Sequence, residues 1–380
     1  MSASTFQRRG VVEGFFGPLW SMSHRASLFE FGVNRGLNTY LYAPKDDPYH
    51  REHWREPYPE IQWKELLNLI HLAHQYRIDF VYGFHPGKGL RFTSQEPFRH
   101  LFAKAARFYE AGVRTFAVLF DDIPSRLEHP KDLKYFAGSL AQAEGVWLDR
   151  VLAQQPKGWR NVEWWICPSY YTEDPLLARS FGSFEPSFLE TLARHLPPTV
   201  ACFWTGPSVV SKKISLAHVR KVACRIRQPL ILWDNYPVND LSMSQEMHLN
   251  PLTGRDPRLP EKVYGYLNNP LLQETLSFVP LATCFDYALN PVEYDPERSW
   301  QRVIREQFGD GTIPHWTAIR KFCNLTNRLK DKRRHLTVSA TMRTALTRAY
   351  HYLCENQGRS WVREFRPWLL LLENTLKNDR

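Results

Sequence analysis

Two consecutive carboxylates, Asp121 and Asp122, follow an apolar run at residues 116–120 and precede Pro124. Two acids that share one pocket repel each other when both are ionised, so the pKa of one rises and that of the other stays low. Such a pair supplies one proton donor and one anion. Because successive strand residues point to opposite faces, both side chains can face one pocket only if the strand ends and the chain turns between them. Pro124 favours that ending.

This pair suits the cleavage of a glycosidic bond, in which the donor protonates the departing oxygen. The anion must then attack the sugar carbon or support a group that does, and neighbouring residues are poorly placed to flank opposite sides of one sugar ring. Attack by the substrate's own 2-acetamido oxygen removes this difficulty, because the anion then only stabilises charge on the acetamido nitrogen. Two other interpretations stay open: one acid caps the following segment, or the pair binds a divalent cation.

The elements that must position these acids alternate along most of the chain. Between residues 10 and 270, short β-rich runs are followed by polar or Gly/Pro loops and then by apolar residues at helical spacing. This alternation predicts an α/β fold with a parallel sheet and crossover helices, and eight such units favour a (β/α)8 TIM barrel over an open doubly wound sheet. The predicted strands are 10–14, 38–42, 80–84, 115–120, 163–167, 201–204, 230–233 and 263–267. The predicted helices include 63–76, 98–111, 134–152 and 216–227.

From about residue 290 the chain becomes polar, basic and helix-prone, with helices predicted at 300–308, 319–330 and 341–355. We therefore expect a catalytic barrel over residues 1–290 and a mainly helical C-terminal extension over residues 291–380. The basic run at 330–335 is interpreted as a solvated helix face. Recruitment of an acidic glycan or of nucleic acid by this run is the alternative.

The composition is that of a folded protein, because 380 residues with 43% hydrophobic content can bury a large core. No apolar run has the length of a signal peptide or of a membrane span, so we expect a cytoplasmic protein without membrane association. The six cysteines are scattered without a CxxC pair, which predicts reduced thiols. The formal net charge of +10 would attract polyanions but identifies no partner.

In a (β/α)8 barrel the active site lies at the carboxyl ends of the strands, so the polar residues after each predicted strand are candidates. They are Gly14, Lys45, Asp46, Asp47, His85, Asp121, Asp122, Tyr170, Tyr171, Thr205, Asn235, Asp240 and Asn269. On composition alone Lys45 would form a surface salt bridge to Asp46 or Asp47. Asp240 could equally be a turn residue in the segment 237–240, and Asn269 a turn former before Pro270. The role of His85, either pocket lining or packing, stays open.

The spacing of His50 and His53 is similar to that of a metal ligand pair, but no third ligand accompanies them, and no metal is expected.

Several ordered segments together resemble glycoside hydrolase family 84, the family of O-GlcNAcases and bacterial β-N-acetylglucosaminidases. The segments are GVVEGFFGPLW at 10–20, LNTYLYAPKDDPYHREHWREPYP at 37–59, FAVLFDDI at 116–123, CPSYY at 167–171, FWTGPSVVSKKI at 203–214, LILWDNYPVND at 230–240 and LNNP at 267–270. The resemblance covers roughly residues 9–290. It implies a (β/α)8 barrel and retaining, substrate-assisted exo-hydrolysis of terminal β-linked N-acetylglucosamine through an oxazoline intermediate, without metal or organic cofactor.

The resemblance also implies roles for individual residues. Asp121 corresponds to the residue that orients and stabilises the acetamido nitrogen, and Asp122 corresponds to the general acid and then base. The positions that hold the sugar hydroxyls match Gly14, Lys45, Asp240 and Asn269, and those around the acetamido group match Tyr171, Trp233 and Asn235.

Two details of the resemblance stay open. The family motif Pro-Thr-Glu-Tyr reads Pro-Ser-Tyr-Tyr at 168–171, so either Tyr170 or Tyr171 points inward, although Tyr171 keeps the register. Thr205 either lines the pocket or only packs around Gly206.

The expected partner is a glycoside, glycan or glycoprotein that bears N-acetylglucosamine, and nucleic acid is not expected. The alternatives are a hexosaminidase directed at glycan, cell-wall or hyaluronan fragments, and a non-catalytic barrel that binds carbohydrate or nucleic acid. The oligomeric state stays open.

Overall fold

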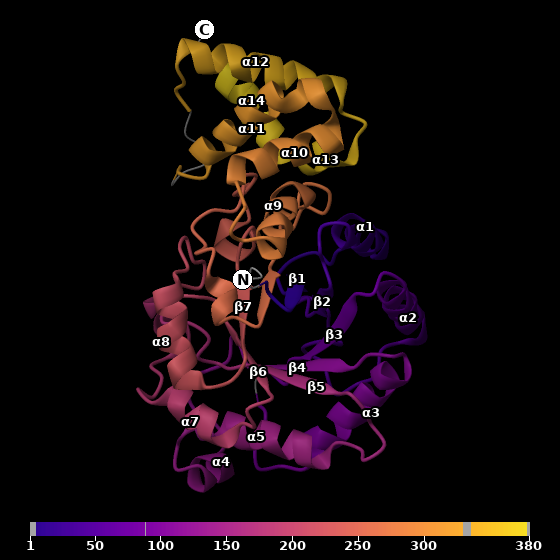
Figure 1. Cartoon of the computed structure of the whole chain (residues 1–380), viewed down its shortest axis with the longest axis vertical. Helices are drawn as coiled ribbons and strands as arrows, with labels where there is room; N and C mark the ends of the chain where they lie inside the picture. The colour runs from indigo at the N-terminus through magenta and orange to yellow at the C-terminus, as the bar shows by residue number, and fades with distance from the viewer. Residues whose placement is uncertain (1–4, 88, 330–335, 378–380) are drawn as a thin grey trace.

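A computed structural model describes residues 5–87, 89–329 and 336–377 of the chain. Eight parallel strands form a barrel in sequence order, and the first and last strands close it by pairing between Arg8↔Gly265 and Val11↔Asn268 (Figure 1). The strands are β1 (Arg8–Glu13), β2 (Thr39–Tyr42), β3 (Asp79–Phe84), β4 (Thr115–Leu119), β5 (Glu163–Cys167), β6 (Ala201–Trp204), β7 (Leu230–Asp234) and β8 (Gly265–Asn268). This closure confirms the predicted TIM barrel and excludes the open sheet.

Most strand residues are apolar and buried because the strands are covered on both faces, and the polar exceptions lie mainly at the strand ends, such as Glu13 and Asp234. In β4, Ala117 and Leu119 belong to the cluster that fills the barrel interior, whereas Phe116 and Val118 belong to the cluster beneath the outer helices. Successive strand side chains point to opposite faces, so this alternation fixes which residue at each strand end can reach the mouth of the barrel.

The same alternation separates two tryptophans near the carboxyl ends of neighbouring strands. Trp204 points outward from β6, where its Nε1 donates a hydrogen bond of 3.0 Å to Nε2 of His218 on the outer helix α8 (Leu216–Ile226). Trp233 on β7 joins the interior cluster. Only Trp233 of the two therefore faces the mouth of the barrel.

Helices cover the outer face of the barrel (Figure 1). They are α1 (Met22–Val33), α2 (Glu60–Gln75), α3 (Glu96–Glu110), α4 (Pro130–Tyr135), α5 (Leu140–Gln154), α6 (Pro175–Phe181), α7 (Phe188–His195), α8 (Leu216–Ile226) and α9 (Phe278–Leu289), with short 3-10 helices η1 (Leu241–Met243) and η2 (Leu259–Glu261). The helices predicted at 63–76, 98–111 and 216–227 correspond to α2, α3 and α8.

The single helix predicted at 134–152 is wrong, because the chain breaks between α4 and α5. Ala137 and Gly138 have positive φ angles of 48° and 82°, which end the first helix. Ser139 then caps the second, since its side chain accepts a hydrogen bond from the amide of Gln142.

The C-terminal helices form a separate layer beyond α9 (Figure 1). They are α10 (Pro296–Phe308), α11 (Ile313–Thr326), α12 (Ala340–Glu355), α13 (Ser360–Glu364) and α14 (Arg366–Lys377), with η3 (Asp310–Thr312) between the first two. The predicted helices at 300–308 and 341–355 lie within α10 and α12. The one predicted at 319–330 begins earlier and ends at Thr326, and α13 and α14 were not predicted. The basic run at 330–335 lies outside the described residues.

Helix α9 joins the two parts of the chain. Its Leu281 and Phe285 belong to the core beneath the barrel helices, whereas Val279 and Ala282 belong to the core of the C-terminal layer. A domain boundary at residue 290 stays a prediction, since the two cores meet on this helix.

Within the described ranges, no helix is long and apolar enough to cross a membrane. All six cysteines lie in these ranges and are free thiols, as predicted.

Candidate active site

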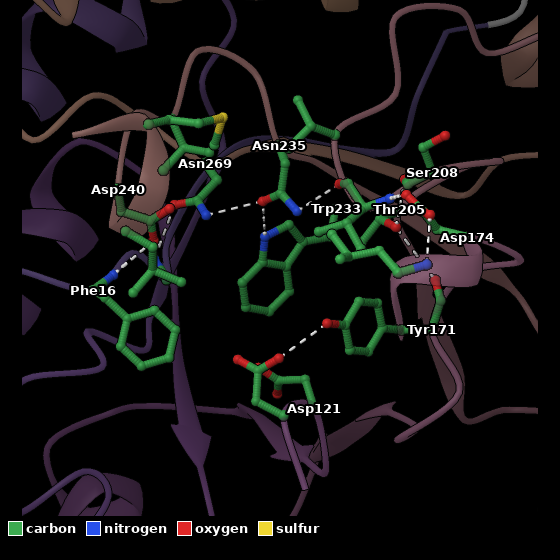
Figure 2. Close-up of a pocket in the computed structure, with 18 of the residues that line it drawn as sticks. Phe16, Asp121, Tyr171, Asp174, Thr205, Ser208, Trp233, Asn235, Asp240 and Asn269 are labelled. Atoms are coloured by element: carbon green, nitrogen blue, oxygen red, sulfur yellow. Dashed lines mark hydrogen bonds between the residues drawn. The ribbon is translucent and has the colours of Figure 1, made fainter. Parts of the chain in front are cut away.

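A cavity of about 390 Å³ opens at the carboxyl ends of the strands (Figure 2). It brings together all nine residues to which the sequence assigned a catalytic or binding role, from six different strand ends. They are Gly14, Lys45, Asp121, Asp122, Tyr171, Trp233, Asn235, Asp240 and Asn269. Thr205 lines the same cavity.

The two acids face this cavity together because the chain turns sharply between them. Strand β4 ends at Leu119, and Asp122 has a φ of 60°, in the left-handed region. Aspartate tolerates this conformation better than most residues, but it still costs on the order of 1 kcal/mol. Contacts on both sides of the turn must therefore hold it.

Lys45 forms a buried ion pair with Asp121 through its Nζ and the Oδ2 of the acid. The surface salt bridge that composition alone favoured for Lys45 is therefore wrong. Asp47 instead accepts hydrogen bonds of 2.6 and 2.8 Å from the hydroxyls of Tyr42 and Tyr58, and Asp46 is exposed. The strand ends of β2 and β4 bring Lys45 to Asp121 from a distance of 76 residues along the chain.

The environment separates the pKa values of the two acids. Burial would raise the pKa of Asp121, but the charge of Lys45 outweighs it and holds this pKa below its usual range. Burial raises the pKa of Asp122, and the neighbouring negative charge of Asp121 raises it further, against the opposing effects of Lys45 and of a hydrogen bond from Tyr171. The site thus holds one acid as an anion and favours the proton on the other.

Tyr171, and not Tyr170, reaches the catalytic pair. The Tyr171 hydroxyl donates a hydrogen bond of 2.9 Å to Oδ1 of Asp122. Tyr170 packs outside the cavity against the rings of Phe184, Phe188 and Trp204. This arrangement answers the question that the altered motif at 168–171 left open.

Opposite the acids, a chain of hydrogen bonds runs across three strand ends (Figure 2). The Gly14 amide donates to Oδ1 of Asn269 at 3.3 Å, and Nδ2 of Asn269 donates to Oδ1 of Asn235 at 3.0 Å. The same Asn235 oxygen accepts a bond of 3.0 Å from Nε1 of Trp233, and its Nδ2 donates to the carbonyl of Val209 at 2.8 Å. These bonds fix the amide orientation of both asparagines and hold the indole as a wall of the cavity.

Gly14 packs directly against that wall. A Cβ atom at this position would lie 2.2 Å from Cζ2 of Trp233, which is far inside van der Waals contact. The glycine is therefore required for the close approach of β1 to the indole.

Asp240 lies buried at the edge of the cavity, where its Oδ2 accepts a hydrogen bond of 2.9 Å from the amide of Phe16. Burial raises the pKa of this acid, while the bond from Phe16 opposes the rise.

The sequence did not single out several residues that complete the cavity. Phe16 lies within a segment of the family resemblance, but the role of its backbone amide depends on the fold. Asp174 lines the cavity as well, and its carboxylate accepts the amides of Leu176 and Val209 at 2.9 and 3.1 Å. The Asp-Pro pair at 174–175 is a helix-start signal that could have revealed this acid as the N-cap of α6.

A second cavity of about 710 Å³ adjoins the first, and Lys45 and Asp122 line both. Arg51 lines the second cavity, where its guanidinium stacks on Phe16 at 5.0 Å from the ring centre. His85 is buried and lines this second cavity, but it does not line the first.

The two histidines of the HREH segment point to different places. His50 is buried and its Nδ1 donates a hydrogen bond of 3.0 Å to the carbonyl of Gly83, whereas His53 is exposed and pairs with Glu56. Across the described ranges, no group of three or more His, Cys, Asp or Glu side chains could hold a metal ion. The expected absence of a metal or organic cofactor stays a prediction.

Comparison with known proteins gives consistent matches. A family model described as beta-N-acetylglucosaminidase matches residues 9–324. The protein O-GlcNAcases of Rattus norvegicus and Mus musculus are 33% identical to the chain over 294 and 297 residues, which is 75% of this chain and 31% of each relative. The chain thus spans less than a third of the length of these curated relatives. A solved structure of a mutant Thermobaculum terrenum O-GlcNAc hydrolase matches with a TM-score of 0.86 at 32% identity, over 97% of this chain and 82% of that one.

Proposed function

This chain belongs to the β-N-acetylglucosaminidase family, glycoside hydrolase family 84, and from this membership we propose that it is a retaining exo-glycosidase that removes terminal β-linked N-acetylglucosamine. The observation that carries the proposal is the difference in pKa between the two acids. Asp121 is paired with the buried Lys45, which keeps it ionised, whereas the pKa of the neighbouring Asp122 is raised. Two acids with different pKa values supply the anion and the proton donor that acetamido-assisted cleavage needs.

In the first step the acetamido oxygen attacks the anomeric carbon while the bond to the leaving oxygen breaks. Asp122 gives its proton to that oxygen, so the leaving group departs neutral. Asp121 accepts a hydrogen bond from the acetamido N–H and stabilises the positive charge that develops as the oxazoline ring forms. The buried ion pair to Lys45 keeps Asp121 ionised for this role.

In the second step a water molecule attacks the anomeric carbon and the oxazoline bond to that carbon breaks. Asp122, now a carboxylate, takes the proton from the water and returns to its starting state. Two successive inversions give overall retention of the β configuration.

The wall opposite the acids is suited to the acetamido group and to the sugar ring. Trp233 offers an apolar face to the acetamido methyl, and the second amide hydrogen of Asn235 holds the acetamido oxygen for in-line attack. Tyr171 lines the same side of the cavity while its hydroxyl bonds to Asp122. The hydroxyls of the sugar are assigned to the four remaining binding residues, Gly14, Lys45, Asp240 and Asn269. A cavity of about 390 Å³ suits one terminal sugar, which favours exo cleavage.

The substrate class is proposed to be N-acetylglucosamine linked to protein or to a small aglycone. Asp122 lines both cavities, so the second one gives a leaving group room beside the acid. A cytoplasmic location stays a prediction.

The test is hydrolysis of two substrates by the wild type and by Asp122→Asn, each assayed with and without a chelator. One substrate is an aryl β-N-acetylglucosaminide with an activated leaving group, and the other is a serine-linked O-GlcNAc peptide. We expect wild-type turnover of both that resists the chelator and is blocked by a thiazoline that mimics the oxazoline. Asp122→Asn should lose far more activity on the peptide, because the aryl leaving group needs little protonation. Equal losses on both substrates would remove Asp122 from the role of acid, and folded but inactive wild-type protein would contradict the proposed activity.

A further inference from the structure

His85 lies directly beneath the turn that carries the two acids, although no catalytic step above uses it. It follows strand β3, and its side chain is 1% exposed. Its Nε2 lies 2.9 Å from the backbone carbonyl oxygen of Asp121. Within the described ranges, no backbone amide donates to this carbonyl, so the imidazole is the group that satisfies it.

The contacts of the ring fix its tautomer. A carbonyl oxygen only accepts hydrogen bonds, so Nε2 must carry a proton to bond to Asp121. Nδ1 is buried and has no hydrogen-bond partner among the described side chains and backbone groups. The neighbouring imidazole of His50, 6.2 Å away between ring centres, donates through its own Nδ1 to Gly83 and competes for neither site. Burial and the charge of Lys45 lower the pKa of His85 to about 3, which keeps the ring neutral.

The Asp122 backbone is held on both sides of its N–Cα bond. The angle φ describes rotation about this bond, which relates the Asp121–Asp122 peptide plane to the Asp122 side chain. His85 fixes the peptide plane through the Asp121 carbonyl, and Tyr171 fixes the carboxylate at 2.9 Å. With both ends held, the bond stays at the left-handed φ of 60°.

We propose that His85 is a positioning residue that holds the Asp121–Asp122 turn so that the general acid reaches the leaving oxygen. This inference rests on the proposed function, because it assigns His85 to the placement of that acid. Without the bond from His85, the peptide plane can rotate and the strained turn can relax toward ordinary φ values. The Asp122 carboxyl would then move away from the leaving oxygen, while Asp240 and Asn269, on the opposite wall, would still bind the sugar.

Three substitutions separate the hydrogen bond from the packing of the ring. His85→Phe keeps a ring of similar shape but removes the donor. His85→Gln places an amide N–H near the position of Nε2, whereas His85→Asn places its N–H near the position of Nδ1, too short to reach the carbonyl. The Gln and Asn variants therefore carry the same amide group, and the extra methylene of Gln changes how far its N–H reaches.

Activity is measured on the serine-linked O-GlcNAc peptide and on the activated aryl glycoside. For His85→Phe and His85→Asn we expect kcat on the peptide to fall by about tenfold or more, with about threefold or less lost on the aryl glycoside, because only the peptide needs full protonation of its leaving group. KM should stay within about threefold of wild type, since the sugar contacts are unchanged. His85→Gln should recover most of the lost kcat. Equal behaviour of the Gln and Asn variants, or equal losses on both substrates, would overturn the proposal.

A measurement on the wild-type protein keeps the inference testable even if these variants do not fold. Nitrogen-15 NMR of labelled histidine reports the protonation and tautomer of each ring. We expect His85 to be neutral with its proton on Nε2 throughout pH 5 to 8. A proton on Nδ1 instead would overturn the proposal, since Nε2 could then donate nothing to Asp121. Because this readout requires no turnover, inactivity of the wild type would count against the proposed function alone.

Discussion

The hydroxyl of Tyr171 donates a hydrogen bond of 2.9 Å to Oδ1 of Asp122, the acid with the raised pKa. A hydrogen bond donated to the carboxylate stabilises its ionised form, so Tyr171 limits how far burial and Asp121 raise this pKa. Tyr171 therefore tunes the proton donor as well as lining the acetamido side of the cavity.

Removing this hydroxyl should shift the pH dependence of the reaction. Tyr171→Phe raises the pKa of Asp122 further, so the acid keeps its proton to higher pH. The alkaline limb of kcat/KM on the O-GlcNAc peptide should move upward, while the maximal rate falls by about tenfold because the carboxyl loses its anchor. The check is a pH profile of kcat/KM for wild type, Tyr171→Phe and Tyr170→Phe. Tyr170→Phe is the control, because Tyr170 packs outside the cavity. An alkaline limb of kcat/KM that moves to lower pH in Tyr171→Phe would contradict the prediction.

Replacing Lys45 should shift the acid limb of the pH profile of kcat/KM. Asp121 acts as an anion, and Lys45 holds its pKa below the usual range. Lys45→Met removes that charge, so the pKa of Asp121 rises and activity is lost at a higher pH as the solution is acidified. The acid limb of kcat/KM on the aryl glycoside should move upward. An unchanged acid limb would mean that another group keeps Asp121 ionised.

The same ion pair makes a prediction about stability. Lys45→Met leaves a buried carboxylate without its partner, which typically costs about 3 to 5 kcal/mol. Adding Asp121→Asn removes the uncompensated charge, so the double variant should be more stable than Lys45→Met while staying inactive. Urea unfolding of the two single variants and the double variant measures the coupling. Additive losses would show that the pair contributes little to the fold.

Gly14→Ala should impair activity more than stability. The added Cβ would lie 2.2 Å from Cζ2 of Trp233, so the indole must move out of the cavity wall. Overpacking of this kind costs about 1 to 3 kcal/mol, but the displaced Trp233 also breaks its bond to Asn235. We expect kcat/KM to fall by about 100-fold, since misplacement near 1 Å has effects of that size. Gly158→Ala is the matched control, because nothing lies within 4 Å of its Cβ position, and it should behave as wild type in the same assays.

Glu144 on α5 should make the protein less stable as the pH rises. It is fully buried, accepts bonds of 3.2 and 3.4 Å from the amide of Ser169, and burial raises its pKa from 4.5 to about 8. Below pH 4.5 both the folded and unfolded states hold the proton. Between 4.5 and 8 only the folded state holds it, so the free energy of unfolding falls by up to about 1.4 kcal/mol per pH unit.

Glu144→Gln keeps an acceptor for Ser169 but cannot ionise. Its stability should match wild type near pH 5 and exceed it at pH 8, as measured by urea unfolding at both values. Glu128→Gln, at an exposed position, controls for loss of one negative charge and should show no such divergence. A Glu144→Gln variant that is less stable at pH 8 would show that the carboxylate is ionised and compensated in the fold.

The sequence alone determined the barrel and the membership of its site. Strands buried on both faces appear as short apolar runs, and the carboxyl ends of parallel strands meet at one mouth, so the polar residues after each run could be gathered without coordinates. The family resemblance then selected eight residues of that set and added Trp233, and all nine line the cavity. The local signals for β5, at 163–167, and β6, at 201–204, even gave the observed bounds.

Only the tertiary structure decided how these side chains pair. Lys45 meets Asp121 rather than Asp46 or Asp47 because two strand ends far apart in sequence come together in the closed barrel. Next to the left-handed turn at Asp122, the ring of His85, which follows the neighbouring strand β3, donates a hydrogen bond to the backbone carbonyl of Asp121. Local sequence patterns indicate which residues are buried and which helix or strand they belong to. The hydrogen-bond and ion-pair partners of a side chain depend on strand register, on the path of the loops and on which side chains share one low-dielectric pocket. Register, loop path and pocket are set only when all eight strands close into the barrel.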